Sequence, residues 1–154
     1  MAKLTGSKKV KTAIFISGRG SNLNNLIKFS KIKKSPIIID LVISNKNAIG
    51  LKYANKYKIK KKIISFENKK TAEMQCLRVL NKRNIKFICL AGFMKIFSSN
   101  FINSFNGKIV NIHPSYLPMY KGLNTSVRAL ENKEKFSGCT VHYVSSKLDS
   151  GQII

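Results

Sequence analysis

The stretch KTAIFISGRGSNLNNLIKFSKIKK, residues 11–34, places a strand signal, a glycine turn and a helix signal in direct succession. KTAIFISG is an apolar run of strand length, whereas SNLNNLIKFSKIKK carries its leucine, isoleucine and phenylalanine side chains at spacings that suit a helix. The same succession continues along the chain. It predicts strands at 11–18, 36–45, 61–65, 87–94, 108–113 and 139–146, and helices at 21–34, 48–58, 71–84, 98–107 and 124–133. This alternation predicts an α/β, Rossmann-like fold, in which a mostly parallel sheet carries helices on both faces.

The 154 residues contain no internal repeat and no linker composition, so we expect one domain over 1–154, with a basic, flexible tail at residues 1–10. No apolar run is long enough to span a bilayer, and the N-terminus lacks the apolar region of a signal peptide. The three cysteines lie far apart, without metal-ligand spacing, which favours free thiols in a reducing compartment. The sequence therefore predicts a cytoplasmic protein.

The net charge of +23 suggests an anionic partner, such as nucleic acid. However, the lysines occur in nearly every segment rather than in one stripe, which favours a solvated lysine surface. We therefore expect no dedicated polyanion partner. The six acidic residues stand out against this background, and each of them calls for its own explanation.

Four polar segments follow predicted strands, at SGRGSN (17–22), AGFMKIF (91–97), NIHPSYLPMYKG (111–122) and SSKLDSGQII (145–154). In open α/β sheets, ligands bind at the carboxyl ends of the strands. Each segment taken alone also has a simpler interpretation. Residues 17–22 could be a glycine turn with a helix cap, and residues 91–97 could be plain core packing. His113 could be a buried core histidine, and Asp149 could be an ordinary turn residue.

Two of these segments have features that favour ligand binding. In SGRGSN, the glycines allow an anion to approach the backbone, and the following helix would offer unpaired N–H groups, although the spacing is not that of a P-loop or a dinucleotide fingerprint. In NIHPSYLPMYKG, Asn111 and His113 stand at i and i+2 of a strand end, so their side chains share one face. Pro114 restrains the backbone of His113.

Taken together, the segments resemble the glycinamide ribonucleotide formyltransferase family, the folate-dependent enzymes of purine synthesis. SGRGSNL (17–23), LAGFMKIF (90–97), NIHPSYLPMYKG (111–122) and GCTVHYVSSKLDSGQII (138–154) carry the resemblance, which extends over nearly all of the chain from Lys11 on. It implies an enzyme that transfers a formyl group directly from 10-formyltetrahydrofolate to the amine of 5′-phosphoribosylglycinamide. It also implies small-molecule partners, no metal, no membrane and no nucleic acid.

The resemblance also implies roles for individual residues. Asn111 and His113 would stabilise the oxyanion of the tetrahedral intermediate, while Asp149 would keep His113 competent as a donor and help proton transfer. His142, on the predicted strand at 139–146, would be a packing residue or would support a residue of the site. The implied phosphate-binding residues are Gly20, Ser21 and Asn22. The implied folate-binding residues are Lys69, Met94, Lys95, Ile96, Phe97, Asn111, Ser145, Ser146, Lys147, Leu148 and Asp149.

Relatives in this family continue beyond the GQII position with further sheet and helix. We therefore expect a C-terminally shortened member, with lower stability and weaker nucleotide binding. Two alternatives remain open. The Asn-x-His-Pro-Ser and Leu-Asp-x-Gly elements are also similar to methionyl-tRNA formyltransferase, although SGRGSN favours the glycinamide ribonucleotide enzyme. A non-catalytic polyanion-binding module on the same fold would also suit the charge.

Overall fold

A single six-stranded sheet, in the order β3-β2-β1-β4-β5-β6, organises the computed structural model, which describes residues 9–154. Its strands are β1 (Val10–Ile16), β2 (Ile37–Ser44), β3 (Lys60–Ile63), β4 (Phe87–Leu90), β5 (Lys108–His113) and β6 (Thr140–Tyr143). Every pairing is parallel except that of β5 with β6, which is antiparallel. The mostly parallel sheet is therefore confirmed. Residues 1–8 of the predicted tail lie outside the described residues.

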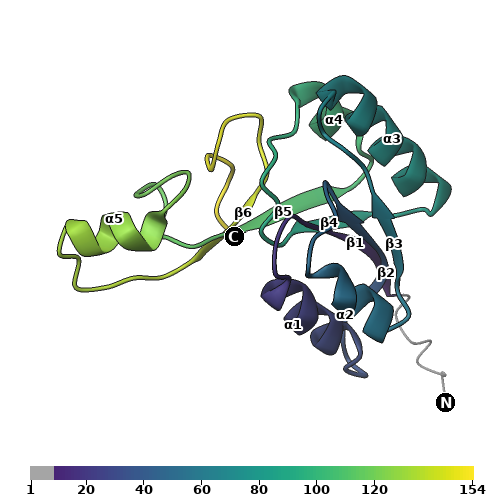
Figure 1. The fold of residues 1–154 in the computed structure, drawn as a ribbon, viewed down its shortest axis with the longest axis horizontal. Helices are drawn as coiled ribbons and strands as arrows, with labels where there is room; N and C mark the ends of the chain where they lie inside the picture. Colours follow the sequence, from purple (N-terminus) through teal and green to yellow (C-terminus); the bar gives the residue numbers. More distant parts are fainter. Residues whose placement is uncertain (1–8) are drawn as a thin grey trace, which may run out of the picture.

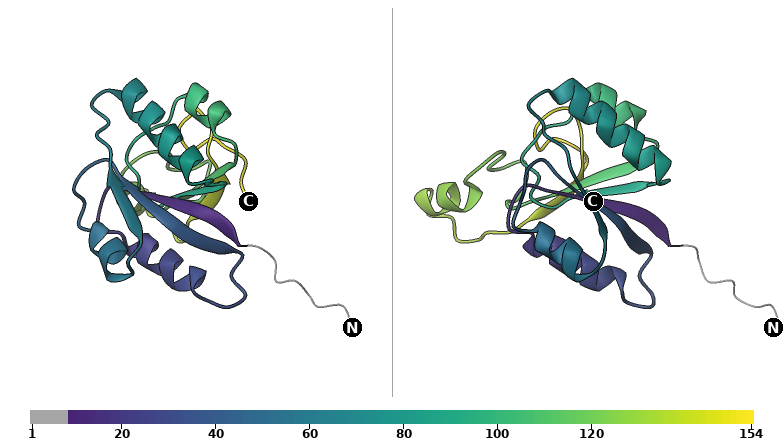
Figure 2. Two further views of the ribbon diagram at one scale, coloured as in Figure 1. Left: turned by 90° about the vertical axis from the view of Figure 1, so that its right-hand side faces the viewer. Right: turned by 45° about the vertical axis from the view of Figure 1, so that its right-hand side comes forward.

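Helices cover both faces of the sheet, as predicted (Figures 1 and 2). They are α1 (Ser21–Ser30), α2 (Leu51–Lys56), α3 (Lys69–Lys82), α4 (Ser99–Ser104) and α5 (Thr125–Glu131). The helices α1 and α2 pack on one face, and α3 and α4 pack on the other. In contrast, α5 projects away from the sheet on an extended arm (Figure 1).

Several predicted elements are too long. The helix expected at 21–34 ends at Ser30, where the Ser30 hydroxyl donates to the Ile27 carbonyl. Such side-chain bonds compete with the helical backbone pattern. The strand expected at 87–94 ends at Leu90, because the chain then turns through Gly92, whose φ is +74°.

Phenylalanines form the centre of the core on the α3 and α4 face. Phe97 stacks on Phe101 at 4.0 Å between ring centroids and meets Phe15 edge-on at 5.5 Å, while Phe93 meets Phe15 at 5.2 Å. Phe93 and Phe97 are buried, whereas residues 94–96 between them are exposed. The two rings thus anchor the loop after β4 in the core and leave residues 94–96 free to line a site.

Glu73 connects α3 to the start of α4. Its buried carboxylate accepts hydrogen bonds from the Ser98 backbone N–H at 2.7 Å and from the Ser98 hydroxyl at 2.5 Å. The Ser98 oxygen in turn accepts from the Phe101 N–H, which caps the N-terminus of α4. The loop that begins after β4 is therefore fixed at its far end by a carboxylate on a neighbouring helix.

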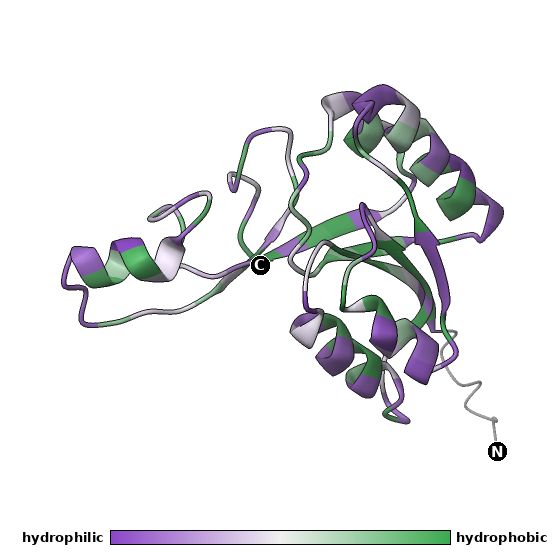
Figure 3. Ribbon diagram, viewed as in Figure 1, coloured by the Kyte–Doolittle hydropathy of each residue, from purple (hydrophilic) through white to green (hydrophobic). Residues whose placement is uncertain are grey.

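The outer strand β3 differs from the interior strands, because all four of its residues are exposed. Three of them are the consecutive lysines Lys60, Lys61 and Lys62. Figure 3 shows this edge of the sheet as hydrophilic, in contrast with the apolar central strands.

All three cysteines are free, as predicted. Cys76 and Cys89 are buried, and burial raises the pKa of each thiol to about 12, whereas Cys139 is exposed. Among residues 9–154, no helix combines the length and the apolar character needed to cross a membrane.

Glu73→Gln should lower the free energy of unfolding by about 1–3 kcal/mol, because the amide keeps the shape but loses one of two buried acceptors. Urea denaturation measures this change. Glu67→Gln is the control, since Glu67 is exposed in the loop before α3 and its substitution should stay within about 0.5 kcal/mol. Equal stability of the two variants would contradict the role assigned to Glu73.

Candidate active site

The carboxyl ends of β1, β4 and β5 meet at one edge of the sheet, because the three strands run parallel. The loops that follow β4, β5 and β6, together with Asn22 in the first turn of α1, surround a cavity of about 740 Å³. This volume lies within the range of small-molecule sites, about 300–1,000 Å³. All four segments selected from the sequence contribute to its lining, through Asn22, residues 92–97, residues 111–114 with Gly122, and residues 145 and 147–149.

Asn111 and His113 both line this cavity from the end of β5. The Asn111 amide Nδ2 lies 3.2 Å from His142 Nε2, on the paired strand β6. Since the amide Nδ2 can only donate, His142 Nε2 accepts, and its Nδ1–H donates to the Tyr143 carbonyl at 2.8 Å. His142 therefore fixes the orientation of the Asn111 amide, and this tautomer follows from the contacts on both ring nitrogens.

His113 is buried, and both of its ring nitrogens have protein neighbours. Nε2 lies 2.8 Å from the Tyr120 carbonyl, to which it donates, and Nδ1 lies 3.3 Å from Asp149 Oδ2. The second distance is longer than the roughly 2.7–2.9 Å of a charge-assisted hydrogen bond. Nδ1 is therefore the less firmly held of the two nitrogens.

Asp149 joins three parts of the site. Its Oδ2 accepts a hydrogen bond from the Gly122 N–H at 2.9 Å and faces His113, while its Oδ1 lies 3.8 Å from His142 Nε2. The side chain is buried, and the backbone has a φ of +44°. A turn conformation thus directs one carboxylate at two histidines and at the loop after β5.

The loop after β1 is tied to the loop after β4 through Ser17. The Ser17 N–H donates to the Gly92 carbonyl at 3.0 Å, and its hydroxyl oxygen accepts from the Met94 N–H at 2.8 Å. Gly20, with a φ of +76°, then turns the chain into α1. The first N–H groups of α1 have no intrahelical acceptor, and Gly20 contributes no side-chain cap. Ser17 was not among the predicted site residues, and only its place at a strand end could have indicated it.

The predicted binding residues divide into two groups. Those that line the cavity are Asn22, Met94, Lys95, Ile96, Phe97, Asn111, Ser145, Lys147, Leu148 and Asp149. Those that do not line it are Gly20, Ser21, Lys69 and Ser146. Lys69 is exposed at the first position of α3, so its predicted folate contact has no support from the cavity. The individual roles stay predictions.

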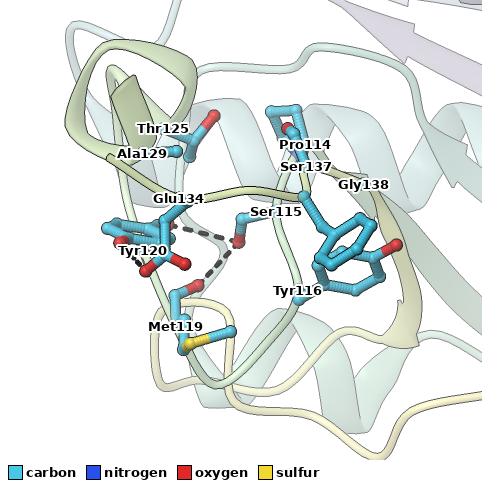
Figure 4. A pocket seen from close by; sticks show the side chains of 11 residues that line it. Pro114, Ser115, Tyr116, Met119, Tyr120, Thr125, Ala129, Glu134, Ser137 and Gly138 are labelled. Atoms are coloured by element: carbon cyan, nitrogen blue, oxygen red, sulfur yellow. Dashed lines mark hydrogen bonds between the residues drawn. The ribbon is translucent and has the colours of Figure 1, made fainter. Parts of the chain in front are cut away.

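A second cavity, of only about 20 Å³, lies behind the loop that follows β5 (Figure 4). Here the Ser115 hydroxyl donates to the Met119 carbonyl at 2.7 Å and approaches the Tyr120 carbonyl at 3.4 Å. The Tyr120 hydroxyl donates to Glu134 at 2.6 Å, and this hydrogen bond raises the pKa of the tyrosine. The cavity has room for about one water molecule, which is too little for a substrate.

Across residues 9–154, no group of three or more histidine, cysteine, aspartate and glutamate side chains is arranged to hold a metal ion. The polar side chains that line the large cavity include the imidazoles of His113 and His142 and the carboxylate of Asp149.

A family model described as "Formyl transferase" matches residues 10–154. The chain belongs to the formyl transferase family. It is 40% identical to the crystal structure of phosphoribosylglycinamide formyltransferase from Brucella melitensis, with a TM-score of 0.89, covering 95% of this chain and 77% of that one. The corresponding structure from Anaplasma phagocytophilum is also 40% identical, with a TM-score of 0.86, covering 96% of this chain and 70% of that one. These matches confirm the resemblance and the fold inferred from the sequence.

The chain is also 44% identical, over 151 residues, to the human "Trifunctional purine biosynthetic protein adenosine-3". The match covers 96% of this chain but only 15% of that protein. The chain thus corresponds to only a small part of the length of this human relative.

Gly122→Ala should lower the free energy of unfolding by about 1–2 kcal/mol, because its φ of +84° is left-handed and a Cβ is strained there. Gly18→Ala is a matched control. Gly18 has no left-handed φ, and a Cβ at this position meets no atom within 4 Å. Urea denaturation of both variants measures the difference. A loss for Gly18→Ala as large as that for Gly122→Ala would show that the strain is not responsible.

Proposed function

We propose that this protein transfers the formyl group of 10-formyltetrahydrofolate to the amine of 5′-phosphoribosylglycinamide, in purine biosynthesis. One observation carries the proposal: Asn111, His113 and Asp149 meet in a cavity of about 740 Å³ that is also lined by Asn22 in the first turn of α1 and by the loop after β4. Residues 10–154, which match the family model, would act as one catalytic domain. The identities of 40% to the two solved formyltransferases support the choice of substrates.

The ribonucleotide phosphate would bind at the N-terminus of α1. The N–H groups of Ser21 and Asn22 lie in the first turn of this helix, and the helix dipole favours a negative charge there. Asn22 lines the cavity, so a phosphate at this position would leave the rest of the substrate directed toward His113. Gly20 and Ser21 would contribute backbone groups at this helix end.

The folate would lie against the exposed residues 94–96 and against the segment 145–149. This wall combines apolar side chains, such as Met94, Ile96 and Leu148, with two exposed lysines, Lys95 and Lys147. Apolar groups suit a flat ring system, and lysines suit the carboxylates of a folate. Both substrates are anionic, which also suits a chain whose net charge is +23.

The reaction requires no enzyme nucleophile. The substrate amine attacks the formyl carbon, and the carbonyl oxygen takes the negative charge of the tetrahedral intermediate. Asn111 Nδ2 retains a second N–H besides the one given to His142 and can donate it to this oxygen. His113 Nε2 already carries the proton donated to Tyr120, so Nδ1 would donate to the oxygen in the doubly protonated form of the ring, beside the Asp149 carboxylate. Asp149 would accept the proton lost by the amine, through water. The bond from carbon to N10 then breaks, and N10 takes up a proton to give tetrahydrofolate.

The partners would be small molecules rather than nucleic acid, since the basic residues are spread over the chain. We propose a cytoplasmic location, because free thiols such as those of Cys76, Cys89 and Cys139 suit a reducing compartment.

The deciding experiment is an assay for tetrahydrofolate release from 10-formyltetrahydrofolate, with and without glycinamide ribonucleotide. Release that depends on the ribonucleotide would support the proposal. Ribonucleotide-independent binding of nucleic acid, with a steep salt dependence, would favour a polyanion-binding module instead.

His113→Ala and Asn111→Ala should each lower kcat by roughly 10²-fold or more, as the loss of an oxyanion donor does. Steady-state kinetics in the tetrahydrofolate-release assay measure the effect, and circular dichroism checks that each variant is folded. A folded variant that keeps nearly the full kcat would exclude its residue from oxyanion stabilisation.

Ser21→Asp should raise the KM for glycinamide ribonucleotide strongly, because the added carboxylate repels a phosphate at the first turn of α1. The KM for 10-formyltetrahydrofolate should stay nearly constant. Kinetics with each substrate varied in turn separate the two constants. An equal rise in both would point to a folding defect rather than to a phosphate site.

A further inference from the structure

Three glycines come into direct backbone contact, Gly18 and Gly20 in the loop after β1 and Gly50 at the end of the loop after β2. The Gly50 N–H donates to the Gly18 carbonyl at 3.0 Å. A Cβ built on Gly50 would lie 2.8 Å from the Gly18 carbonyl oxygen and 2.9 Å from Gly20 Cα. A Cβ built on Gly20 would lie 2.7 Å from Gly50 Cα. These distances leave no room for a side chain on either residue.

The backbone conformation of Gly50 does not require glycine. Its φ of −59° and ψ of −21° are right-handed helical values, which any L-residue adopts. Gly20 differs, because its φ of +76° is itself left-handed. The requirement for glycine at position 50 therefore comes from the space between the two loops and not from its own torsion angles.

The contact holds the loop after β1, which leads directly into the N-terminus of α1, where we propose phosphate binding. Because β2 neighbours β1 in the sheet, and β4 neighbours it on the other side, the loop after β1 has a support on each flank. Ser17 ties it to the loop after β4, and Gly50 holds it from the side of β2. The loop that leads into α1 is thus held by two backbone hydrogen bonds, from Ser17 to Gly92 and from Gly50 to Gly18.

We propose that Gly50 is a positioning residue for the binding of a phosphomonoester dianion at the N-terminus of α1. It touches no substrate and acts through Gly18 and Gly20. This inference rests on the proposed function, because it assumes that the loop after β1 holds the phosphate of the ribonucleotide substrate. A side chain at position 50 pushes Gly18 and Gly20 outward, so the N–H groups of Ser21 and Asn22 move away from the phosphate.

The test compares Gly50→Ala with the unmodified chain, using the tetrahydrofolate-release assay and calorimetric binding of glycinamide ribonucleotide. We expect the KM and the dissociation constant of the ribonucleotide to rise roughly 10- to 100-fold, the scale of losing a hydrogen bond to a charged group. The KM for 10-formyltetrahydrofolate and kcat at saturation should change less than about twofold, since the loop after β4 keeps its own anchors. A simple loss of stability would not separate the two substrates in this way.

Two controls make the result specific. Ile49→Ala changes the neighbouring residue, whose side chain is 66% exposed, and should leave both substrate constants unchanged. The Cβ that Gly50→Ala introduces would also lie 2.9 Å from Ile16 Cδ1, so the double variant Ile16→Val with Gly50→Ala removes that contact alone. If the double variant keeps the ribonucleotide defect, the clash with the phosphate loop is the cause. If Gly50→Ala alone does not fold, the double variant, which keeps only the close contacts with Gly18 and Gly20, is assayed in its place.

Three results would overturn the inference. These are unchanged ribonucleotide binding in Gly50→Ala, equal losses for both substrates, and full recovery in the double variant. An unmodified chain that binds the ribonucleotide but transfers no formyl group would contradict the proposed function alone, and the binding comparison would still decide the role of Gly50. An unmodified chain that does not bind the ribonucleotide at all would overturn both.

Discussion

The parallel pairing of β1 with β4, and of β4 with β5, is the constraint on which the site depends. In this register, Phe15 lies opposite Leu90, and Leu90 lies opposite Asn111, so the three strands end at the same level. Parallel strands cannot be joined by tight turns, and each carboxyl end must therefore lead into a loop and a helix. The loops bring groups from distant parts of the sequence to one cavity, while the phenylalanine cluster and Glu73 hold the wall formed after β4.

The sequence could predict the strands and the fold because the periodic signal is strong where strands are buried on both faces. β1 and β2 are nearly continuous apolar runs, and helices with apolar stripes separate them. Element ends were less predictable. The end of α1 depends on the Ser30 hydroxyl, and the end of β4 depends on the left-handed turn at Gly92. Neither of these local effects has a periodic signature.

For the site, the sequence indicated Asn111, His113 and Asp149, because their motifs have distinctive composition and spacing. It could not give the contacts among them. The 3.3 Å approach of Asp149 to His113, and the 3.2 Å contact of Asn111 with His142, depend on the antiparallel addition of β6, which brings residues some thirty positions apart to adjacent places. The sequence left His142 as either a packing or a supporting residue, and its contact with the Asn111 amide is that of a supporting residue. The sequence could not indicate Gly50, because the lack of room for a Cβ at this position comes from contacts with Gly18 and Gly20, which only the folded structure shows.

The row of lysines on β3 has a consequence for how copies of this chain meet. An outer strand offers unpaired N–H and C=O groups to any other strand that approaches it. A second copy that added its own β3 here would bring two rows of ammonium groups within about 5 Å of each other. Because side chains alternate between faces, Lys61 would repel on one face, and Lys60 and Lys62 on the other. This electrostatic barrier opposes the pairing of two copies through β3, and it weakens as salt shortens the range of the repulsion.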